Sequence, residues 1–427
     1  MTTEITLHEY AASEHKLSAG QLETLLQESK ILHLSVEPIK SRKGSYILTS
    51  GSKVGALEYD GVSLLITPKI GISQLLSLAC YAMGFYKPQD RNFDFKEAKE
   101  LPDVLALSLT GAARRAFSRG LLHGYLTEEE ALFTVRGRIQ FSEQICRRFS
   151  IPLPVELRFD DFTEDILANR LVKAAAARLG RMTLRSADAR RGLGWIATTL
   201  DNVSLREYRK ERVPEVRFDR LNEHYRQVVG LARLILLHSE YESLRGDVRA
   251  SGFLIDMNTL FQEFLTRALR ESLGFSERTL HAEKGDWFDK GKSVWLKPDL
   301  SWWENSTTCT FVGDAKYKDL TTKPARHTDL YQLLAYVTTL NLPGGLLIYA
   351  QGGAGTTTYT VRHSGKRLEV FALDLSCSLD DILARIETLA RKIRSLRAEA
   401  LDLRASQNTT ASQSSSVQPA TQQGVPA

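Results

Sequence analysis

The chain has 427 residues and a mass of 47.9 kDa, which corresponds to two or three domains at about 100–200 residues per domain. Hydrophobic residues make up 43% of it and charged residues 25%, so it can bury a core, and wholesale disorder is excluded. The formal net charge of +5 permits a polyanionic partner but does not require one.

The compartment is indicated by the cysteines and by the hydropathy of the chain. Its four cysteines are widely scattered and form no Cys-x-x-Cys pair, so a zinc ribbon and a disulfide framework are both disfavoured. The polar start MTTEITLHEY is unlike a signal peptide, and no apolar run reaches the roughly 18–20 residues that span a bilayer. We expect a soluble cytoplasmic protein with reduced thiols and no membrane partner.

Residues 1–100 are predicted to form a β-rich N-terminal domain. Short apolar runs lie at 31–39, 46–49, 54–59 and 62–68. The pair Asp60-Gly61 between the last two runs predicts a tight hairpin turn, because both turn positions favour positive φ. A helix is expected over residues 72–85.

Residues 101–250 are predicted to form a mainly helical linking domain. Apolar residues recur at spacings of three and four in the segments 101–122, 165–179 and 221–238. Residues 132–141, around Gly137, are more typical of a strand. We interpret this region as scaffold.

Residues 251–377 are predicted to form a separate α/β domain. Helices are expected over 256–273 and 328–340, and strands over 280–284, 294–300, 308–316, 346–350 and 368–375. The first six of these elements follow the order α-β-β-β-α-β, which is typical of an α/β sandwich with a mixed sheet.

The C-terminal segment divides into a helix over residues 378–405 and a tail over 406–427. From Leu379 to Leu403 apolar residues repeat with heptad spacing, and Ser378 is a good N-cap. The stripe either packs on its own domain or mediates self-association as a coiled coil. The tail is polar and of low complexity, and we expect it to be disordered.

The sharpest chemical motif combines Asp299, Asp314 and Lys316. Side chains alternate along a strand, so Asp314 and Lys316 project from the same face. The apolar residues before them predict a buried strand, and charges at its end must be paired or functional. If the strand 294–300 is the antiparallel neighbour, with a turn near Asn305, then Asp299 faces Asp314 across the strand ends.

Two facing carboxylates form a hard-oxygen site that suits Mg²⁺. A neighbouring lysine is placed to orient or deprotonate a water molecule and to offset charge on a phosphate. Such an assembly hydrolyses phosphodiesters with metal assistance. On a strand, the alternative is an ordinary surface Asp–Lys pair.

Two helices are candidates to complete the site. Glu263, in the helix 256–273, is a candidate third carboxylate, although a solvated helix face also explains it. Gln332 and Tyr336 share a face of the helix 328–340. Gln332 is placed to bind the lysine or a phosphate, or else it is an ordinary polar surface residue.

One other segment resembles a nucleotide-binding loop and is rejected. Between Gly285 and Gly291 lie five residues where the phosphate-binding motif has four, and the acidic Asp286 and Asp289 lie inside. If the protein uses the energy of a nucleoside triphosphate, another chain supplies it.

Several segments together resemble the McrC family, the endonuclease subunit of McrBC-type, 5-methylcytosine-specific restriction systems. The segments are 296–300 (LKPDL), 312–318 (VGDAKYK), 54–55 (VG), 66–71 (ITPKIG), 135–139 (VRGRI), 159–165 (FDDFTED) with Asn169, and 253–258 (FLIDMN). The resemblance extends over roughly residues 5–375 and omits the C-terminal helix and tail.

The resemblance implies a PD-(D/E)xK nuclease fold for residues 251–377 and Mg²⁺-dependent cleavage of double-stranded DNA, methylated or not. It implies Asp299 and Asp314 as metal ligands, Lys316 as the catalytic lysine, and a Gln-x-x-x-Tyr helix at Gln332 and Tyr336. It also implies an obligate McrB-like AAA+ GTPase hexamer as partner, stimulated by the N-terminal half. The family's Phe-Glu is replaced here by Phe261-Gln262-Glu263, so either Glu263 takes over as the ligand or the position is non-essential.

Two other functions remain open from the sequence. One is a binding module with a nuclease fold that activates the partner NTPase without cleaving DNA. The other is a structural coiled-coil assembly protein, indicated by the stripe from Leu379 to Leu403 alone.

Overall fold

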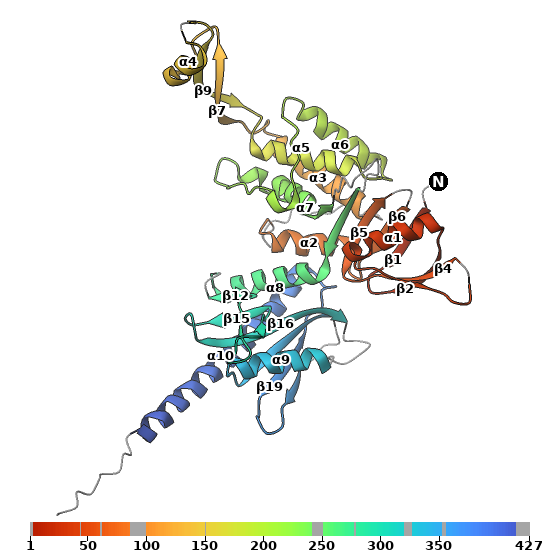
Figure 1. Ribbon diagram of the computed structural model, residues 1–427, viewed down its shortest axis with the longest axis vertical. Coiled ribbons are helices and arrows are strands. Elements are labelled where there is room, and N and C mark those ends of the chain that lie inside the picture. Colours follow the sequence, from red (N-terminus) through yellow and green to blue (C-terminus); the bar gives the residue numbers. More distant parts are fainter. Residues whose placement is uncertain are drawn as a thin grey trace, which may run out of the picture. The chain divides into compact units, whose positions relative to one another are not determined.

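The structure is a computed structural model that describes residues 3–42, 44–59, 62–85, 100–149, 151–240, 251–276, 279–319, 327–351 and 356–415. The chain divides into two compact units, Met1–Asp256 and Met257–Ala427 (Figure 1). Among the described helices, none is both long and apolar enough to cross a membrane.

The first unit is built on a sheet with the strand order β1-β6-β5-β11-β10. The strands are β1 (Thr3–His8), β5 (Lys53–Tyr59), β6 (Val62–Thr67), β10 (Ser239–Glu240) and β11 (Ser251–Asp256). Alternate residues of β6, namely Val62, Leu64 and Ile66, are buried, as expected of a strand with one face on the core. β5 and β6 pair antiparallel, which confirms the predicted hairpin, although its turn Asp60-Gly61 lies outside the described residues.

The boundary between the units lies after the strand β11, and not before it as predicted. The sequence assigns residues 251–256 to the C-terminal domain, but β11 pairs with β5 and belongs to the first unit. The approach is close at Gly55, where a Cβ atom would lie 1.9 Å from the carbonyl oxygen of Phe253. Only glycine fits there, and its φ of 141° is one that other residues rarely adopt. The paired residues lie about 200 positions apart in the sequence, so no local sequence pattern indicates that they pair.

A helix near the N-terminus escapes the sequence analysis. α1 (Ala19–Leu32) begins with a capping box in which Ser18 and Gln21 bond to each other's backbone N–H groups. The run 31–39, predicted to be β, contains the end of this helix and the short strand β3 (Ser35–Pro38). β3 joins β2 (Ala12–Lys16) and β4 (Ser45–Thr49) in the sheet order β2-β4-β3.

The first unit contains the four helices predicted from the sequence, each shorter than predicted, and a further helix, α6 (Ala187–Thr199), that was not predicted. They are α2 (Ile72–Ala82), α3 (Leu101–Phe117), α5 (Leu167–Gly180), α6 and α7 (Arg226–His238), with the 3-10 turns η1 (Lys210–Arg212) and η2 (Glu223–Tyr225). α3 is buried along most of its length, and α5 and α7 pack together. This packing forms the scaffold expected of the middle region.

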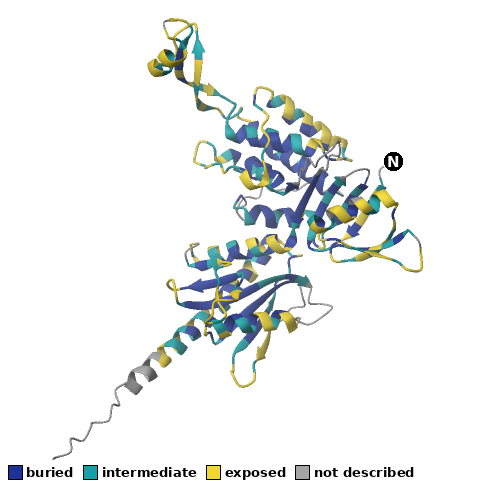
Figure 2. Ribbon diagram, in the orientation of Figure 1, coloured by how far each residue is buried: buried dark blue, intermediate teal, exposed yellow. Residues whose placement is uncertain are grey.

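The middle region also contains a sheet that the prediction of a mainly helical domain misses. β7 (Gly124–Leu132), β8 (Arg138–Ile139) and β9 (Val155–Thr163) pair in the order β7-β9-β8, and α4 (Phe141–Arg147) lies between β8 and β9. We call residues 124–163 the arm. The predicted strand 132–141 shrinks to β8, because Gly137 has a φ of 74° and breaks the extended conformation. α4 has no buried residue, and Figure 2 shows much of the arm as exposed.

The second unit is a six-stranded mixed sheet with the order β12-β15-β16-β17-β19-β18. Its strands are β12 (Leu280–Ala282), β15 (Leu300–Trp303), β16 (Cys309–Asp319), β17 (Gly344–Gln351), β18 (Thr356–Thr360) and β19 (Arg367–Ala372). β16, β17 and β19 run parallel and the other pairs are antiparallel. Helices α8 (Met257–Leu273) and α9 (His327–Thr339) cover opposite faces of the sheet (Figure 1). This arrangement confirms the predicted α/β sandwich with a mixed sheet.

The strand predicted over 294–300 is divided into two. β14 (Trp295–Leu296) pairs with β13 (Asp286–Trp287) in a separate hairpin, and the neighbour of β16 is β15. Residues 297–299 connect the two strands, because a proline within the run removes a ladder donor. The turn between β15 and β16 lies where it was expected, with the side chain of Asn305 accepting bonds from the backbone N–H groups of Thr307 and Thr308.

The C-terminal helix α10 (Leu379–Ser415) packs on its own unit, against α8 and β16. Its stripe is buried at Leu379, Ile382, Ile386, Leu389, Ile393, Leu396 and Ala400. The chain itself therefore covers the face that self-association through this helix would need. The helix continues ten residues beyond the predicted end at 405, so the disorder predicted for the tail is wrong for residues 406–415. Residues 416–427 lie outside the described part.

Candidate catalytic site

The strand β16 carries two of the predicted site residues on one face. Asp314 is 1% exposed and Lys316 is half-buried, and the Nζ of Lys316 lies 2.5 Å from Oδ2 of Asp314. Val312, two residues earlier, packs into the apolar cluster beneath α9. Because side chains alternate along a strand, Asp314 and Lys316 continue the α9 face at the point where this cluster ends.

Asp299 reaches the pair from the segment before β15. In the antiparallel register Leu300 lies opposite Gly313, which places Asp299 next to Asp314. Oδ2 of Asp299 accepts a hydrogen bond of 2.9 Å from the backbone N–H of Ala315. The structure thus brings Asp299, Asp314 and Lys316 together, although the antiparallel neighbour of β16 is β15 and not the predicted strand 294–300.

The pKa of Asp299 is shifted by its surroundings. Burial and the neighbouring charge of Asp314 together raise the pKa of Asp299 to about 7, and the N–H of Ala315 opposes this shift. Burial alone would lower the pKa of Lys316, but the carboxylates of Asp314, Asp299 and Asp329 outweigh burial and raise it. Lys316 is therefore a cation at neutral pH, lying against two carboxylates that repel each other.

The donor set fits a hard divalent cation. Among the described residues, neither carboxylate oxygen of buried Asp314 accepts a well-formed hydrogen bond, and only the ion pair with Lys316 partly compensates Oδ2. Orphaned carboxylate oxygens are costly unless a cation binds them. Asp299 and Asp314 supply two such ligands, and Mg²⁺ commonly uses one or two protein carboxylates together with water and phosphate oxygens.

No third ligand joins them in the described part of the chain, where no group of three His, Cys, Asp or Glu side chains could hold a metal ion. Glu263 in particular is not brought to the pair. It is exposed on α8, where partial desolvation raises its pKa. Phe261 of the same helix packs against Tyr317, with ring centroids 6.2 Å apart. Tyr317 alternates with Lys316 along β16, so α8 covers the face opposite the Asp314 side chain.

The helix α9 supports the segment that carries Asp299. The Nε2 of Gln332 donates a bond of 2.7 Å to the hydroxyl of Tyr336, which donates a bond of 3.2 Å to the carbonyl oxygen of Lys297. Burial, together with the nearby charge of Asp314, raises the pKa of Tyr336 to about 12. Gln332 therefore touches the site through Tyr336, and no bond joins it to Lys316.

A second acidic group, not predicted from the sequence, lies beside the site. Asp329, in the first turn of α9, is 4% exposed. It accepts two bonds of 2.9 Å from the Nζ of Lys318 and one of 2.7 Å from the hydroxyl of Tyr349. Lys318 follows Lys316 on the same face of β16, so the repeated Asp-x-Lys-x-Lys pattern is the signal that points to a partner for the second lysine.

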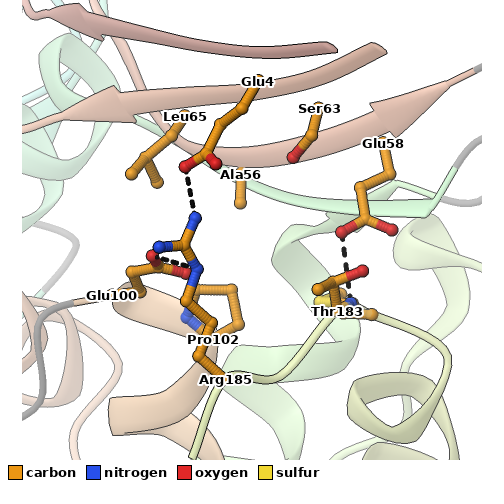
Figure 3. Close-up of a pocket in the computed structure, with 10 residues that line it drawn as sticks. Glu4, Ala56, Glu58, Ser63, Leu65, Glu100, Pro102, Thr183 and Arg185 are labelled. Carbon is orange, nitrogen blue, oxygen red and sulfur yellow. Dashed lines mark hydrogen bonds and ion pairs between the residues drawn. The ribbon is translucent and has the colours of Figure 1, made fainter. Parts of the chain in front are cut away.

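A different cavity lies in the first unit (Figure 3). Arg185 forms ion pairs there with Glu4 and, at 2.8 Å, with Glu100, and the N–H of Thr183 donates to Glu58 at 3.2 Å. These bonds tie β1, the start of α3 and the segment before α6 together. The carboxylates are engaged in structure, and we assign no chemistry to this cavity.

Fold and site define a two-unit α/β protein whose C-terminal sheet carries an Asp–Asp–Lys cluster. Residues 48–350 match the family described as McrBC 5-methylcytosine restriction system component. The chain belongs to this family.

The chain is also similar to individual proteins. The chain is 24% identical over 301 residues to the type IV methyl-directed restriction enzyme EcoKMcrBC of Escherichia coli (strain K12), a match that covers 66% of this chain and 86% of the relative. Its fold is similar to a chain in the refined half-complex from the tetradecameric assembly of Thermococcus gammatolerans McrB AAA+ hexamers with bound McrC. That match has a TM-score of 0.61 and 20% identity, and it covers 92% of this chain and 100% of the other. A chain of the Thermococcus gammatolerans McrBC complex aligns over 64% of this chain and 88% of that chain, with a TM-score of 0.42 and 24% identity.

Proposed function

We propose that this chain is the DNA endonuclease subunit of a two-component, NTP-dependent restriction system, and that its second unit is a PD-(D/E)xK nuclease domain. The observation that carries the proposal is the buried, under-bonded Asp314 held between Asp299 and Lys316 on one face of a mixed sheet. The reaction is hydrolysis of phosphodiester bonds in double-stranded DNA.

In this proposal Asp299 and Asp314 hold Mg²⁺, which polarises the scissile phosphate and lowers the pKa of a bound water molecule. Lys316 is a cation and contributes by offsetting the charge that develops on the phosphate. Its raised pKa disfavours the role of general base that the sequence left open. Tyr336 holds the backbone of the Asp299 segment in place.

The first unit is proposed to contact and stimulate a McrB-like AAA+ GTPase. In the solved relative, McrB AAA+ hexamers carry bound McrC. The arm offers a surface that suits a protein partner, since several of its large apolar side chains lie in solvent. They are Tyr125, Phe133, Val135, Phe141, Ile145, Phe149, Ile151 and Phe162. Exposed apolar side chains of this number are typical of an interaction surface.

The test is plasmid cleavage in Mg²⁺ by the chain with its AAA+ partner, comparing wild type with Asp314→Ala on methylated and unmethylated DNA. We expect cleavage by wild type only, with association and NTPase stimulation kept in both. Cleavage by the variant would show that the site is misassigned. If neither cleaves while both stimulate the NTPase, the chain is instead a non-cleaving activator.

A further inference from the structure

The segment rejected above as a nucleotide-binding loop folds into a hairpin directly beside the candidate site. β13 and β14 pair antiparallel, with Trp287 opposite Trp295. The two indole rings meet edge to face, with centroids 4.9 Å apart and an interplanar angle of 78°. We call residues 283–297 the tryptophan hairpin.

The base of the tryptophan hairpin is joined to Asp299. The N–H of Glu283 donates to the carbonyl oxygen of Asp299 at 3.4 Å, and the Nζ of Lys297 lies 2.7 Å from the carboxylate of Glu283. The strands are so close at the base that a Cβ on Gly285 would lie 1.8 Å from the carbonyl oxygen of Leu296. A molecule bound at Asp299 therefore lies next to this hairpin.

The hairpin presents apolar side chains that do not join the core. Trp287 is 37% exposed, Phe288 51%, Val294 48% and Trp295 50%. The rings are large and carry their apolar faces into solvent, where a monomeric protein gains nothing from them. On a DNA duplex, apolar side chains of this kind pack in a groove or wedge between base steps.

Two exposed lysines at the tip give the hairpin positive charge in addition to its aromatic rings. Lys290 and Lys292 lie in the loop between the strands. Two acidic residues lie inside the hairpin. Asp286 is exposed on β13, and its carboxylate accepts a bond of 2.7 Å from the N–H of Trp287. The carboxylate of Asp289 is turned onto the loop and accepts bonds of 2.9 Å from the N–H of Ser293, the hydroxyl of Ser293 and the N–H of Val294. These bonds hold the loop in shape, and Lys290 and Lys292 supply its positive charge.

We infer that the tryptophan hairpin is a DNA-contacting element that positions the cleaved strand beside Asp299. In this role Lys290 and Lys292 bind backbone phosphates, and Phe288 with the two tryptophans makes apolar contacts in a groove of the duplex. The inference rests on the proposed function, since DNA is the substrate it names. DNA is favoured over a protein as occupant because the lysines supply complementary charge and the hairpin is continuous with the site for phosphate chemistry.

The experiment measures binding of a fluorescent DNA duplex to the full-length chain by anisotropy, without Mg²⁺, over a series of salt concentrations. The Lys290→Gln/Lys292→Gln variant should lower the slope of log affinity against log salt by about 1.8, since each phosphate contact contributes about 0.9. Phe288→Ser should weaken binding about tenfold, because it removes an apolar contact with the duplex. Arg362→Gln, which removes an exposed charge from another turn of the same unit, should leave binding unchanged.

Each outcome decides the inference. If the hairpin variants bind DNA with wild-type affinity and slope while wild type cleaves, the inference is overturned and the proposed nuclease stands. Intact DNA binding with lost association of the AAA+ partner, or with a changed oligomeric state, overturns it in favour of a protein interface. A wild-type chain that neither binds nor cleaves DNA, alone or with its partner, overturns the inference and the proposed function together. Circular dichroism melts of all variants check that these exposed substitutions leave the fold intact.

Discussion

The hydroxyl of Tyr336 donates a hydrogen bond of 3.2 Å to the carbonyl oxygen of Lys297, two residues before Asp299. The ring of Tyr336 is buried in the apolar cluster under α9, so the hydroxyl has a fixed position. Through this bond the helix on one face of the sheet constrains the backbone of a segment that contributes a carboxylate to the site. Gln332 extends this series of hydrogen bonds, because its side-chain amide donates to the hydroxyl of Tyr336.

Replacement of Tyr336 by phenylalanine should slow DNA cleavage about tenfold and lower the free energy of unfolding by about 1 kcal/mol. The change removes one hydrogen bond and leaves the ring in place. Single-turnover cleavage and urea unfolding measure the two effects. Tyr331→Phe is the matched control, since this tyrosine lies on the same helix but is 67% exposed. Equal effects of the two substitutions would show that the bond to Lys297 does not position the site.

The stability of the protein should depend on pH through Asp299. Its pKa is raised to about 7, above the value of about 4 in an unfolded chain. The folded state therefore keeps a proton that the unfolded state releases, and the contribution of Asp299 to stability is lost as pH rises from about 4 through about 7. Thermal unfolding of wild type and Asp299→Asn, compared without metal from pH 5 to pH 8, measures it. The melting temperature of the variant should rise relative to that of wild type as pH increases. A difference in melting temperature that stays constant with pH would contradict the expectation.

Added Mg²⁺ should raise the melting temperature of the wild type at pH 8, because a cation that binds only the folded state stabilises it. Asp314→Asn should lose most of this shift, since the buried carboxylate is replaced by a neutral amide. Glu263→Gln should keep it, because the structure places Glu263 on the helix that covers the other face. A loss of the shift in Glu263→Gln would restore this residue as a metal ligand.

The stripe of α10 should matter for stability and not for self-association. Leu389 is fully buried within its own unit, so Leu389→Ala should lower the free energy of unfolding by about 2–5 kcal/mol. The exposed Arg391→Ala on the same helix serves as control. Sedimentation velocity should give the same oligomeric state for both variants and for wild type. A specific loss of oligomer in Leu389→Ala would favour the coiled-coil alternative.

The exposed side chains of the arm should be needed for binding the AAA+ partner and not for folding of the chain. Phe141 is 69% exposed and Phe149 79% exposed, so replacing both with serine should change the melting temperature little. The same change should weaken association with the AAA+ partner at least tenfold, because exposed aromatic residues commonly dominate interface energies. Co-sedimentation and NTPase stimulation measure the effect. Undiminished stimulation would place the partner contact elsewhere in the chain.

Local sequence patterns were sufficient to predict a mixed sheet in the second unit and the contact between Asp299 and Asp314. In β16 the apolar residues Phe311 and Val312 precede Asp-Ala-Lys, and the hairpin with β15 is closed by a short turn that the sequence marks with Asn305. Period-two alternation and a nearby turn are local properties, so they could be predicted without knowledge of the rest of the chain. The same holds for the burial of the stripe from Leu379, which its heptad spacing indicates.

The sequence by itself thus determined the α/β sandwich, the acidic residues that meet at its centre and the family resemblance. Only the tertiary structure decided that β11 belongs to the first unit, that Glu263 lies on the wrong face, that Asp329 holds Lys318, and that a rejected loop is a hairpin joined to Asp299. The reason is common to these cases. Each depends on which residues, distant in sequence or on opposite sides of a sheet, come into contact when the core closes, and periodicity specifies a side chain's face without specifying what packs against it.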